Sequence, residues 1–298
     1  MARAKLGRVM IDYASVGEER APAVILISGW KGQKTFWSEQ FVAHLVDAGY
    51  RVITIDNRDA GKSGRVCSFY LPPAALLFGG RFSPIFRYYV PYRIEDMADD
   101  VVALMDHLHI SSAHVVGFSL GGMISQVLAA SYPNRVLSLT LLGTTTNRLG
   151  LPMPPLKVIR NVFLRSEYFL TRKQRAALSI ERWKSFGTPD GHQDTPEFHA
   201  RVEEAISRGM GHMASRRQFA AGIATGDLRA KYTKKISAPT LVLHGTEDGM
   251  LSKEHGEDIA ANIEKSRLEI IDGWGHDLAP SVLTTILPLM VTHLDAVR

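Results

Sequence analysis

Cysteine and long apolar runs are scarce in this chain of 298 residues. The single cysteine, Cys67, has no second thiol to pair with, which excludes a fold held by internal disulfides and favours a reducing compartment. No apolar run approaches the roughly 20 residues that a membrane-spanning helix needs. The first 25 residues lack the continuous apolar segment of a secretory signal. We therefore expect a cytoplasmic protein without a membrane span.

Internal repeats, low-complexity tracts and metal-binding patterns are also absent from the sequence. His107, His109 and His114 lie close together, but their spacing is not that of metal ligands, so we expect no metal and no cofactor. With 45% hydrophobic residues, the chain is long enough to bury a sizeable core. The composition is that of an ordinary globular protein, a monomer or a homodimer.

The net charge of +5 is unevenly distributed. Residues 148–235 contain 17 Lys or Arg against 8 Asp or Glu, whereas the rest of the chain contains 18 against 22. This asymmetry predicts a basic module on a slightly acidic one. Because no nucleic-acid-binding motif accompanies it, we interpret the basic segment as a solvated helical surface and expect no nucleic-acid partner. Binding to an anionic surface is the alternative, and it would weaken steeply with salt.

Short β-branched runs alternate with helical stretches outside this segment. The expected helices include residues 39–48, 95–108 and 122–130, and the expected strands are residues 23–27, 51–55, 113–116, 136–142, 240–244 and 268–271. Alternating strands and helices predict an α/β fold with a mostly parallel, twisted sheet and helices on both faces.

The basic segment interrupts this alternation. It opens with Pro152, Pro154 and Pro155 and then shows only helical patterns, at residues 157–170, 172–183, 197–207 and 216–225. We predict a core domain made of residues 1–147 and 235–298, and a helical cap, residues 148–234, inserted between two strands of the sheet.

A glycine-flanked serine follows the predicted strand at residues 113–116 and precedes a predicted helix. Strand, sharp turn and helix are the context of a nucleophile elbow, in which small residues let strand and helix approach closely. The serine hydroxyl then lies at a helix N-terminus, where negative charge is stabilised. The motif is Gly117-Phe118-Ser119-Leu120-Gly121, with Ser119 as the candidate nucleophile.

A serine nucleophile needs a histidine base and a carboxylate that orients the histidine. His276 follows the predicted strand at 268–271, and Asp248 follows the one at 240–244, so both belong at the same sheet edge as Ser119. The chain order Ser119, Asp248, His276 is that of an α/β-hydrolase. The weaker alternatives are Glu247 for the carboxylate, Asp272 and Asp277 as residues that shape the histidine loop, and His244 as a structural histidine.

The oxyanion of acyl transfer needs two N–H donors. We expect them from Leu120, directly after the nucleophile, and from Trp30, in the loop Ser28-Gly29-Trp30 after the first core strand. Trp30 is equally interpretable as a packing aromatic.

Several longer motifs resemble one known family. Residues 56–63 (DNRDAGKS), 92–98 (YRIEDMA), 117–123 (GFSLGGM) and 275–278 (GHDL) are similar to α/β-hydrolase fold serine hydrolases of the aclacinomycin methylesterase-like, carboxylesterase branch. The resemblance extends over essentially the whole chain. Many relatives have His-Gly in the oxyanion loop where this chain has Ser28-Gly29, so the local hydrogen bonding must differ while the backbone donor remains.

The resemblance implies acyl transfer, because relatives that dehalogenate or open epoxides use an aspartate where this chain has Ser119. The leading hypothesis is a serine hydrolase that cleaves a carboxylic ester of a small, largely apolar substrate through an acyl-enzyme. The alternatives on the same triad are a thioesterase, a lactonase, a cofactor-free haloperoxidase, perhydrolase or lyase, and a slow-turnover ligand receptor.

Aromatic residues are available to line a substrate pocket. The candidates are Phe118, Phe163, Phe169, Trp183 and Trp274. Tyr168, Phe186 and Phe219 of the basic segment are further aromatic candidates, and Leu156 and Leu164 are aliphatic ones. The loop 65–91 adds Phe69, Tyr70, Phe78, Phe82, Phe86, Tyr88 and Tyr89. These aromatics are expected either to form an apolar pocket under a basic rim or to pack the cap onto the core.

Overall fold

The computed structural model describes residues 2–66, 90–167, 169–209 and 212–297. Within them, eight strands form one sheet in the order β1-β2-β4-β3-β5-β6-β7-β8. The pairs β1–β2 and β2–β4 are antiparallel, and every other pair is parallel. The strands are β1 (Ala2–Leu6), β2 (Val9–Val16), β3 (Ala23–Ile27), β4 (Arg51–Ile55), β5 (Ala113–Phe118), β6 (Val136–Leu142), β7 (Thr240–Gly245) and β8 (Ser266–Ile271).

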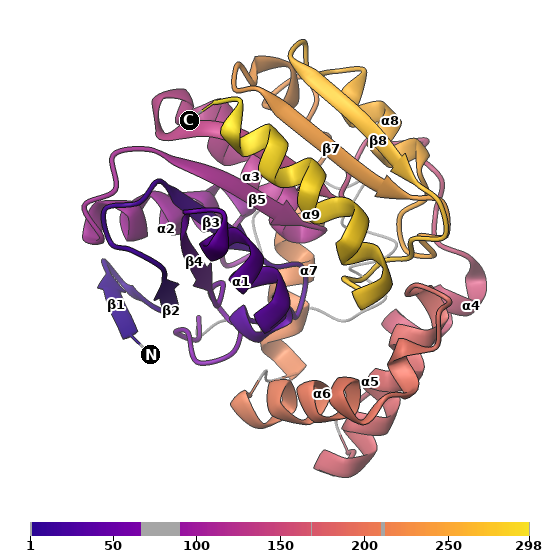
Figure 1. Cartoon of the computed structure of the whole chain (residues 1–298). Helices are drawn as coiled ribbons and strands as arrows, with labels where there is room; N and C mark the ends of the chain where they lie inside the picture. Colours follow the sequence, from indigo (N-terminus) through magenta and orange to yellow (C-terminus); the bar gives the residue numbers. More distant parts are fainter. Residues whose placement is uncertain (1, 67–89, 168, 210–211, 298) are drawn as a thin grey trace.

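Helices cover both faces of this sheet (Figure 1). On one face α1 (Glu39–Asp47) and α9 (Pro280–Asp295) pack against the strands. On the other face lie α2 (Ile94–His107), α3 (Leu120–Ser131) and α8 (Glu254–Ala260). The predicted mostly parallel sheet with helices on both faces is therefore confirmed.

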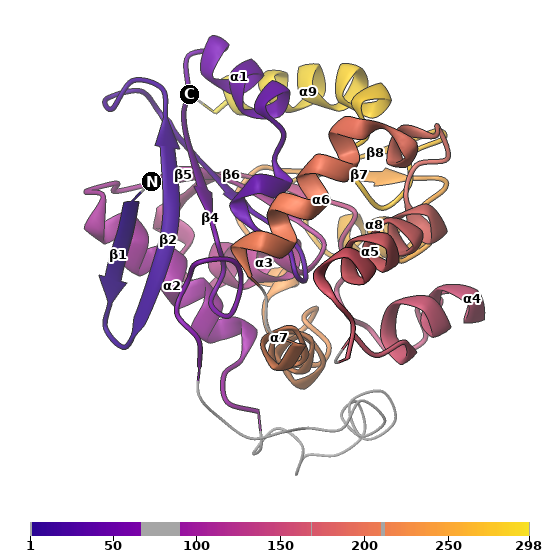
Figure 2. The same cartoon turned by 90° about the horizontal axis from the view of Figure 1, so that it is seen from below.

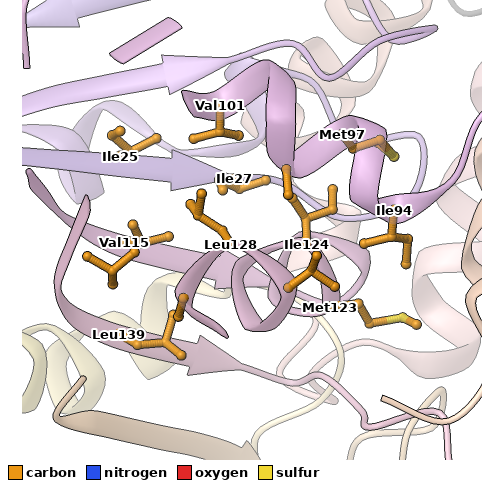
Figure 3. Close-up of a cluster of buried hydrophobic side chains, with 14 of the residues drawn as sticks. Ile25, Ile27, Ile94, Met97, Val101, Val115, Met123, Ile124, Leu128 and Leu139 are labelled. Carbon is orange, nitrogen blue, oxygen red and sulfur yellow. The ribbon is translucent and has the colours of Figure 1, made fainter. Parts of the chain in front are cut away.

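The core forms because the central strands are apolar on both sides. All five residues of β3 are buried, as a strand covered on both faces requires. Figure 3 shows one half of this core, where sheet residues meet the apolar sides of α2 and α3. The buried side chains labelled there include Ile25, Ile27, Val115 and Leu139 from the sheet and Met97, Val101, Ile124 and Leu128 from the helices.

The predicted strands correspond closely to the observed ones. Residues 23–27, 51–55 and 136–142 are predicted with their exact bounds, and the other three strands are one or two residues longer than predicted. The antiparallel pair β1–β2 is not predicted. Its inward residues, Ala4, Ile11 and Tyr13, are buried by packing in the core cluster that includes α2, a contact that neither strand's own sequence indicates.

The predicted helix at residues 157–170 is wrong over its second half. The chain forms α4 (Leu156–Ile159) and a π-helical turn (Arg160–Leu164), after which Arg165 is extended. Arg182 explains this ending, because its guanidinium donates to the carbonyl oxygens of Asn161 (2.9 Å) and Arg165 (2.9 Å). The carbonyl groups that a longer helix would use are thereby satisfied by a side chain.

We call residues 148–234 the cap segment. It contains α4, α5 (Arg172–Phe186), α6 (Pro196–Arg208) and α7 (His212–Thr225), and no strand among its described residues. Figure 2 shows these helices from the side of the molecule on which α5 and α6 project in Figure 1. The cap segment contacts the loop after β3, where the Trp30 indole donates to the carbonyl of Ser215 (2.6 Å) and Gln33 to that of Ala205 (2.7 Å).

Two buried ion pairs connect the cap segment to the loop after β4. Arg208, at the end of α6, binds Asp56 (2.6 Å), and Arg217 of α7 makes two hydrogen bonds to Asp59 (2.6 and 2.8 Å). Both carboxylates are fully buried. Removing one partner of such a pair leaves an uncompensated charge in the interior.

Replacing Arg217 with methionine is therefore expected to lower the free energy of unfolding by about 3–5 kcal/mol. Arg229→Met is the matched control, because Arg229 pairs with Asp227 at the surface, where an ion pair contributes about 1 kcal/mol or less. Urea unfolding of both variants measures the difference. Equal destabilisation by the two substitutions would show that the Arg217–Asp59 pair is not a structural anchor.

Candidate active site

Ser119 occupies a strained turn between β5 and α3. Its backbone angles, φ 54° and ψ −119°, are in a region that side-chain-bearing residues rarely adopt. Residues at and after the end of β6 hold the turn: the Ser119 N–H donates to the carbonyl of Leu142 (3.0 Å), and the Thr144 hydroxyl donates to the Ser119 carbonyl (2.6 Å). The hydroxyl of Ser119 thus stands beside the N-terminus of α3.

The glycines around Ser119 are required by close packing. A Cβ on Gly121 would lie 2.0 Å from the carbonyl oxygen of Ile27, and one on Gly117 would lie 2.3 Å from Ser125 Oγ. A Cβ on Gly29 would lie 3.0 Å from the Cβ of Ser119, so the loop after β3 passes directly beside this serine. Strand, helix and loop therefore approach as an elbow requires.

His276 and Asp248 lie next to Ser119. The Nε2 atom of His276 is 3.0 Å from Ser119 Oγ, and its Nδ1 atom is 2.7 Å from Asp248 Oδ2. The second carboxylate oxygen of Asp248 accepts the backbone N–H groups of Met250 (2.9 Å) and Leu251 (2.7 Å). Because Asp248 is held by these two amides, it fixes the ring of His276 with Nε2 directed at the serine.

The alternative residues occupy other positions. His244 is fully buried, its Nε2 lies 2.7 Å from the carbonyl oxygen of Leu251, and burial lowers its pKa, so the ring is neutral. Asp272 accepts a hydrogen bond from the Thr246 hydroxyl (3.1 Å). Asp277 is buried and binds the cap segment. None of these three contacts the Ser119 hydroxyl.

The cap segment supports the loop that carries His276. The N–H of His276 donates to the carbonyl of Phe186, at the end of α5 (2.8 Å). Its neighbour Asp277 accepts the N–H (2.9 Å) and the hydroxyl (2.6 Å) of Thr188, and the side-chain amide of Gln193 (3.3 Å). The sequence gives no sign of these contacts, because they join residues about 85–90 positions apart.

Two backbone amides beside Ser119, those of Leu120 and Trp30, are the candidate oxyanion donors. Leu120 is the first residue of α3, where the N–H has no partner within the helix. Trp30 follows Gly29 in the loop beside Ser119. Among the described residues, neither N–H donates a hydrogen bond. The indole of Trp30 also packs against Phe163 (5.5 Å between ring centroids), so this residue is a packing aromatic as well.

A cavity of about 730 Å³ opens over Ser119 and His276. This volume is in the usual range for small-molecule sites. Of the predicted pocket residues, Phe118, Phe163 and Trp183 line it, as do Phe186 and Phe219. The cap segment supplies most of the aromatic lining, and the loop after β3 and the end of β5 supply the rest. The structure therefore places apolar groups around Ser119.

Two predicted pocket residues are corrected. Phe169 is 92% exposed and lies outside the cavity, because the chain has left its helix before this position; Leu156 and Leu164 are also exposed. Trp274 is 0% exposed and packs into the core beneath α9, with its indole N–H bound to the carbonyl of Asp277 (2.7 Å). The predicted residues Tyr168, Phe69, Tyr70, Phe78, Phe82, Phe86, Tyr88 and Tyr89 lie outside the described residues.

The described part of the chain shows no group of three or more His, Cys, Asp or Glu residues arranged to hold a metal ion. Of its helices, none combines the length and the apolar character that crossing a membrane requires.

The model of one protein family, described as alpha/beta hydrolase fold, matches residues 22–280. Curated relatives include the rhodomycin D methylesterase DnrP of Streptomyces peucetius, 25% identical over 94% of this chain and 93% of that protein. A second is the 3-oxoadipate enol-lactonase 2 of Acinetobacter baylyi, 27% identical over 89% of this chain and 85% of that protein. These matches confirm the resemblance that the sequence motifs indicated.

Solved structures agree on the fold. The enol-lactonase of Burkholderia xenovorans LB400 superposes with a TM-score of 0.76 at 24% identity, covering 99% of this chain and 100% of that one. The meta-cleavage product hydrolase CumD of Pseudomonas fluorescens IP01 gives 0.76 at 21% identity, covering 100% and 98%. At these identities the similarity is evidence for the fold alone.

Proposed function

The chain belongs to the α/β-hydrolase fold family, and on this premise we propose that it is a serine hydrolase that cleaves carboxylic esters through an acyl-enzyme. The observation that carries the proposal is the row of hydrogen bonds from Ser119 through His276 to Asp248, 3.0 and 2.7 Å long, in the cavity under the cap segment. Family membership supports hydrolysis in general, and this geometry supports a serine nucleophile.

In the proposed mechanism the Ser119 oxygen attacks the ester carbonyl carbon while His276 Nε2 takes the hydroxyl proton. Asp248 stabilises the imidazolium that forms. The N–H groups of Leu120 and Trp30 receive the negative oxygen of the tetrahedral intermediate. His276 then gives its proton to the departing alkoxide, which leaves an acyl group on Ser119.

Water completes the cycle by the same chemistry. His276 takes a proton from a water molecule, whose oxygen attacks the acyl carbon, and then returns the proton to Ser119 as the acid leaves. The proposal needs no cofactor, because nucleophile, base and donors all come from the chain.

The substrate is proposed to be small and largely apolar. The supporting observation is that aromatic side chains of the cap segment, Phe163 and Trp183 among them, line the cavity with Ser119. We propose that residues 148–234 act as the cap that shapes this pocket. The ester body would then be bound mainly by burial of apolar surface, at about 0.8 kcal/mol for each CH₂ group.

Initial rates on p-nitrophenyl esters from acetate to laurate test the function. We expect kcat/KM to rise by about fourfold for each added CH₂ until the pocket is filled, and then to fall. Trp183→Ala is expected to move the maximum to longer acyl chains, because it removes an aromatic wall. Phe169→Ala is the control, since this exposed ring lies outside the cavity.

If the wild type hydrolyses the esters and Trp183→Ala has the same dependence of kcat/KM on acyl chain length, the pocket assignment is contradicted. The esterase activity itself would still stand. No turnover on any ester of the series would contradict the general esterase itself. A ligand receptor on the same triad would bind such esters and release product very slowly, so the turnover rate separates that alternative from an enzyme.

Lactones are the second candidate substrates. The observation that favours them is that one curated relative is named as an enol-lactonase. A lactone is a cyclic ester, so the proposed chemistry is the same, with the leaving alkoxide still attached to the acyl group. The rates of hydrolysis of simple γ- and δ-lactones, measured by the release of protons from the acid product, compare this class with the open-chain esters.

A further inference from the structure

The lining of the cavity over Ser119 contains more basic than acidic side chains. Five Lys or Arg residues line it, Lys31, Arg148, Arg175, Arg182 and Arg201, against the two acidic residues Glu167 and Asp277. This excess lies on the inner surface of the site rather than on the solvated outer surface of the cap helices. The charges therefore bear on what the cavity binds.

Both acidic residues are already engaged. Glu167 forms ion pairs with Lys31 (2.8 Å) and with Arg182. Asp277 accepts three hydrogen bonds from Thr188 and Gln193, and lies 3.3 Å from the ring of His192. Neither carboxylate forms an ion pair with Arg201 in the described part of the chain. The lining thus contains no carboxylate left over for a further cation.

Arg201, on α6, and Arg175, on α5, are the two lining cations without an ion pair among the described residues, and of the two Arg175 donates to the carbonyl of Leu170 (3.0 Å). Among the described residues Arg201 makes no hydrogen bond and no ion pair, and its guanidinium carbon lies 5.6 Å from the ring centroid of Phe198. Burial lowers the pKa of Arg201 and the charge of Asp277 opposes this, yet a guanidinium keeps its proton at any ordinary pH. A partly buried charge with only a ring beneath it is poorly solvated. An anion that binds there replaces the favourable interactions with water that the guanidinium lost on burial.

A row of aromatic rings joins this arginine to the triad. The ring centroids of His276 and Phe186 are 6.0 Å apart, those of Phe186 and Trp183 are 5.1 Å apart, and those of Trp183 and Phe198 are 6.2 Å apart. We call Phe186, Trp183 and Phe198 the aromatic wall. Arg201 lies over its far end, whereas Ser119 lies beside His276 at its near end.

We propose that Arg201 is an anion subsite, and that the substrate is an ester whose apolar body runs along the aromatic wall and ends in a carboxylate or similar oxyanion. This inference rests on the proposed function, because it specifies which esters the site prefers. A planar guanidinium matches a carboxylate with two parallel hydrogen bonds, which gives the far end of the cavity a geometric as well as an electrostatic preference. The scissile carbonyl would lie at Ser119.

The test uses pairs of esters that differ only in charge. Mono-p-nitrophenyl esters of linear dicarboxylic acids with six to ten carbons place the anion on the acyl side, and their methyl-capped diesters are the neutral counterparts. Acetyl esters of ω-hydroxy acids and of their methyl esters place it on the alcohol side. The variants are Arg201→Gln, Arg201→Lys and, as the matched control, Lys173→Gln, which removes an equal charge from the exposed side of α5.

In the wild type, the charged member of at least one series is expected to have the higher kcat/KM. Arg201→Gln is expected to lower kcat/KM for that charged ester by roughly ten- to 150-fold, the value of a charge-assisted hydrogen bond. The neutral ester should change by about twofold or less. Arg201→Lys is expected to restore part of the loss, and Lys173→Gln to cause none.

Two results would overturn the inference. Equal losses on charged and neutral esters in Arg201→Gln would show that Arg201 only supports the structure of α6. Equal rates on charged and neutral esters in the wild type, in both series, would show that the cavity does not select an anion. In either case the esterase itself would stand.

Failure of the proposed function gives a different pattern. If the wild type hydrolyses no ester, charged or neutral, calorimetric binding of suberic acid monomethyl ester to Ser119→Ala still tests the subsite. Binding that disappears on adding Arg201→Gln but not Lys173→Gln would keep the anion subsite without the activity. Binding that is unchanged by Arg201→Gln would contradict the anion subsite as well as the esterase activity.

Discussion

Replacing Ser119 with alanine is expected to lower kcat on the best p-nitrophenyl ester by about six orders of magnitude, the loss seen when a serine nucleophile is removed. The reason is that, among the described residues, Ser119 supplies the only hydroxyl hydrogen-bonded to His276 Nε2, at 3.0 Å. Adding His276→Ala to this variant is expected to cost little more, because nucleophile and base act as one unit.

Ser179→Ala is the matched control for this measurement. Ser179 lines the same cavity but lies on α5, away from the histidine, so its removal should change kcat by about twofold or less. Comparable losses in Ser119→Ala and Ser179→Ala would mean that the decrease reflects disturbance of the cavity. A Ser119→Ala variant with nearly full activity would assign the chemistry to another residue.

Gly121→Ala is expected to lower the free energy of unfolding by more than about 3 kcal/mol. The added Cβ would lie 2.0 Å from the carbonyl oxygen of Ile27 and 2.8 Å from that of Ser28, and both atoms are backbone that cannot rotate away. To relieve this steric clash, α3 must move away from β3, which opens the central core and shifts the Ser119 turn. Urea unfolding measures the loss of stability. In the most severe case, the variant would show no cooperative unfolding transition.

The control is the same substitution at a glycine that has space for a Cβ atom. Gly222 is inside α7, and a Cβ there would meet only the end of the Leu120 side chain at 3.4 Å, an ordinary contact. Alanine is the better helix former, so Gly222→Ala is expected to raise stability by about 0.5–1 kcal/mol. If both alanine variants unfold at the same urea concentration, the close approach of α3 to β3 is not what fixes the elbow.

The central sheet could be predicted because its strands carry their own signal. Ala23–Ile27 and Arg51–Ile55 are short runs rich in β-branched residues between turns, a pattern typical of a strand buried on both faces. The hairpin β1–β2 could not, since its inner residues are buried by tertiary packing in the core cluster that includes α2. The helix expected over 157–170 failed for a similar reason, because Arg182 from another helix ends it.

The candidate triad follows from topology, whereas the cavity does not. Parallel strands bring their carboxyl ends to one edge, so residues after β5, β7 and β8 are expected to meet. Here His276 lies 3.0 Å from Ser119 and 2.7 Å from Asp248. Which aromatic lines the cavity depends on tertiary contacts. Phe169 and Trp274 are equally aromatic in the sequence, yet one is exposed and the other is in the core.

The basic lining of the cavity also could not be predicted from the sequence. The excess of Lys and Arg in residues 148–235 was evident, and a solvated surface was the natural interpretation. The structure divides these residues into anchors, such as Arg208 and Arg217, and cavity residues, such as Arg175, Arg182 and Arg201. Only the ion-pair partners, which are distant in the chain, distinguish the two groups.

The central claim is that Ser119 is a nucleophile activated by His276, and stoichiometric labelling with a p-nitrophenyl phosphonate ester tests it most directly. Attack by Ser119 Oγ forms a bond to phosphorus and releases p-nitrophenolate, leaving a stable adduct on the chain. We expect one p-nitrophenolate and one adduct per chain, found by peptide mass analysis at Ser119, and a reaction that His276→Ala slows by several orders of magnitude. Labelling at another residue, or equal labelling of the wild type and Ser119→Ala, would contradict the account.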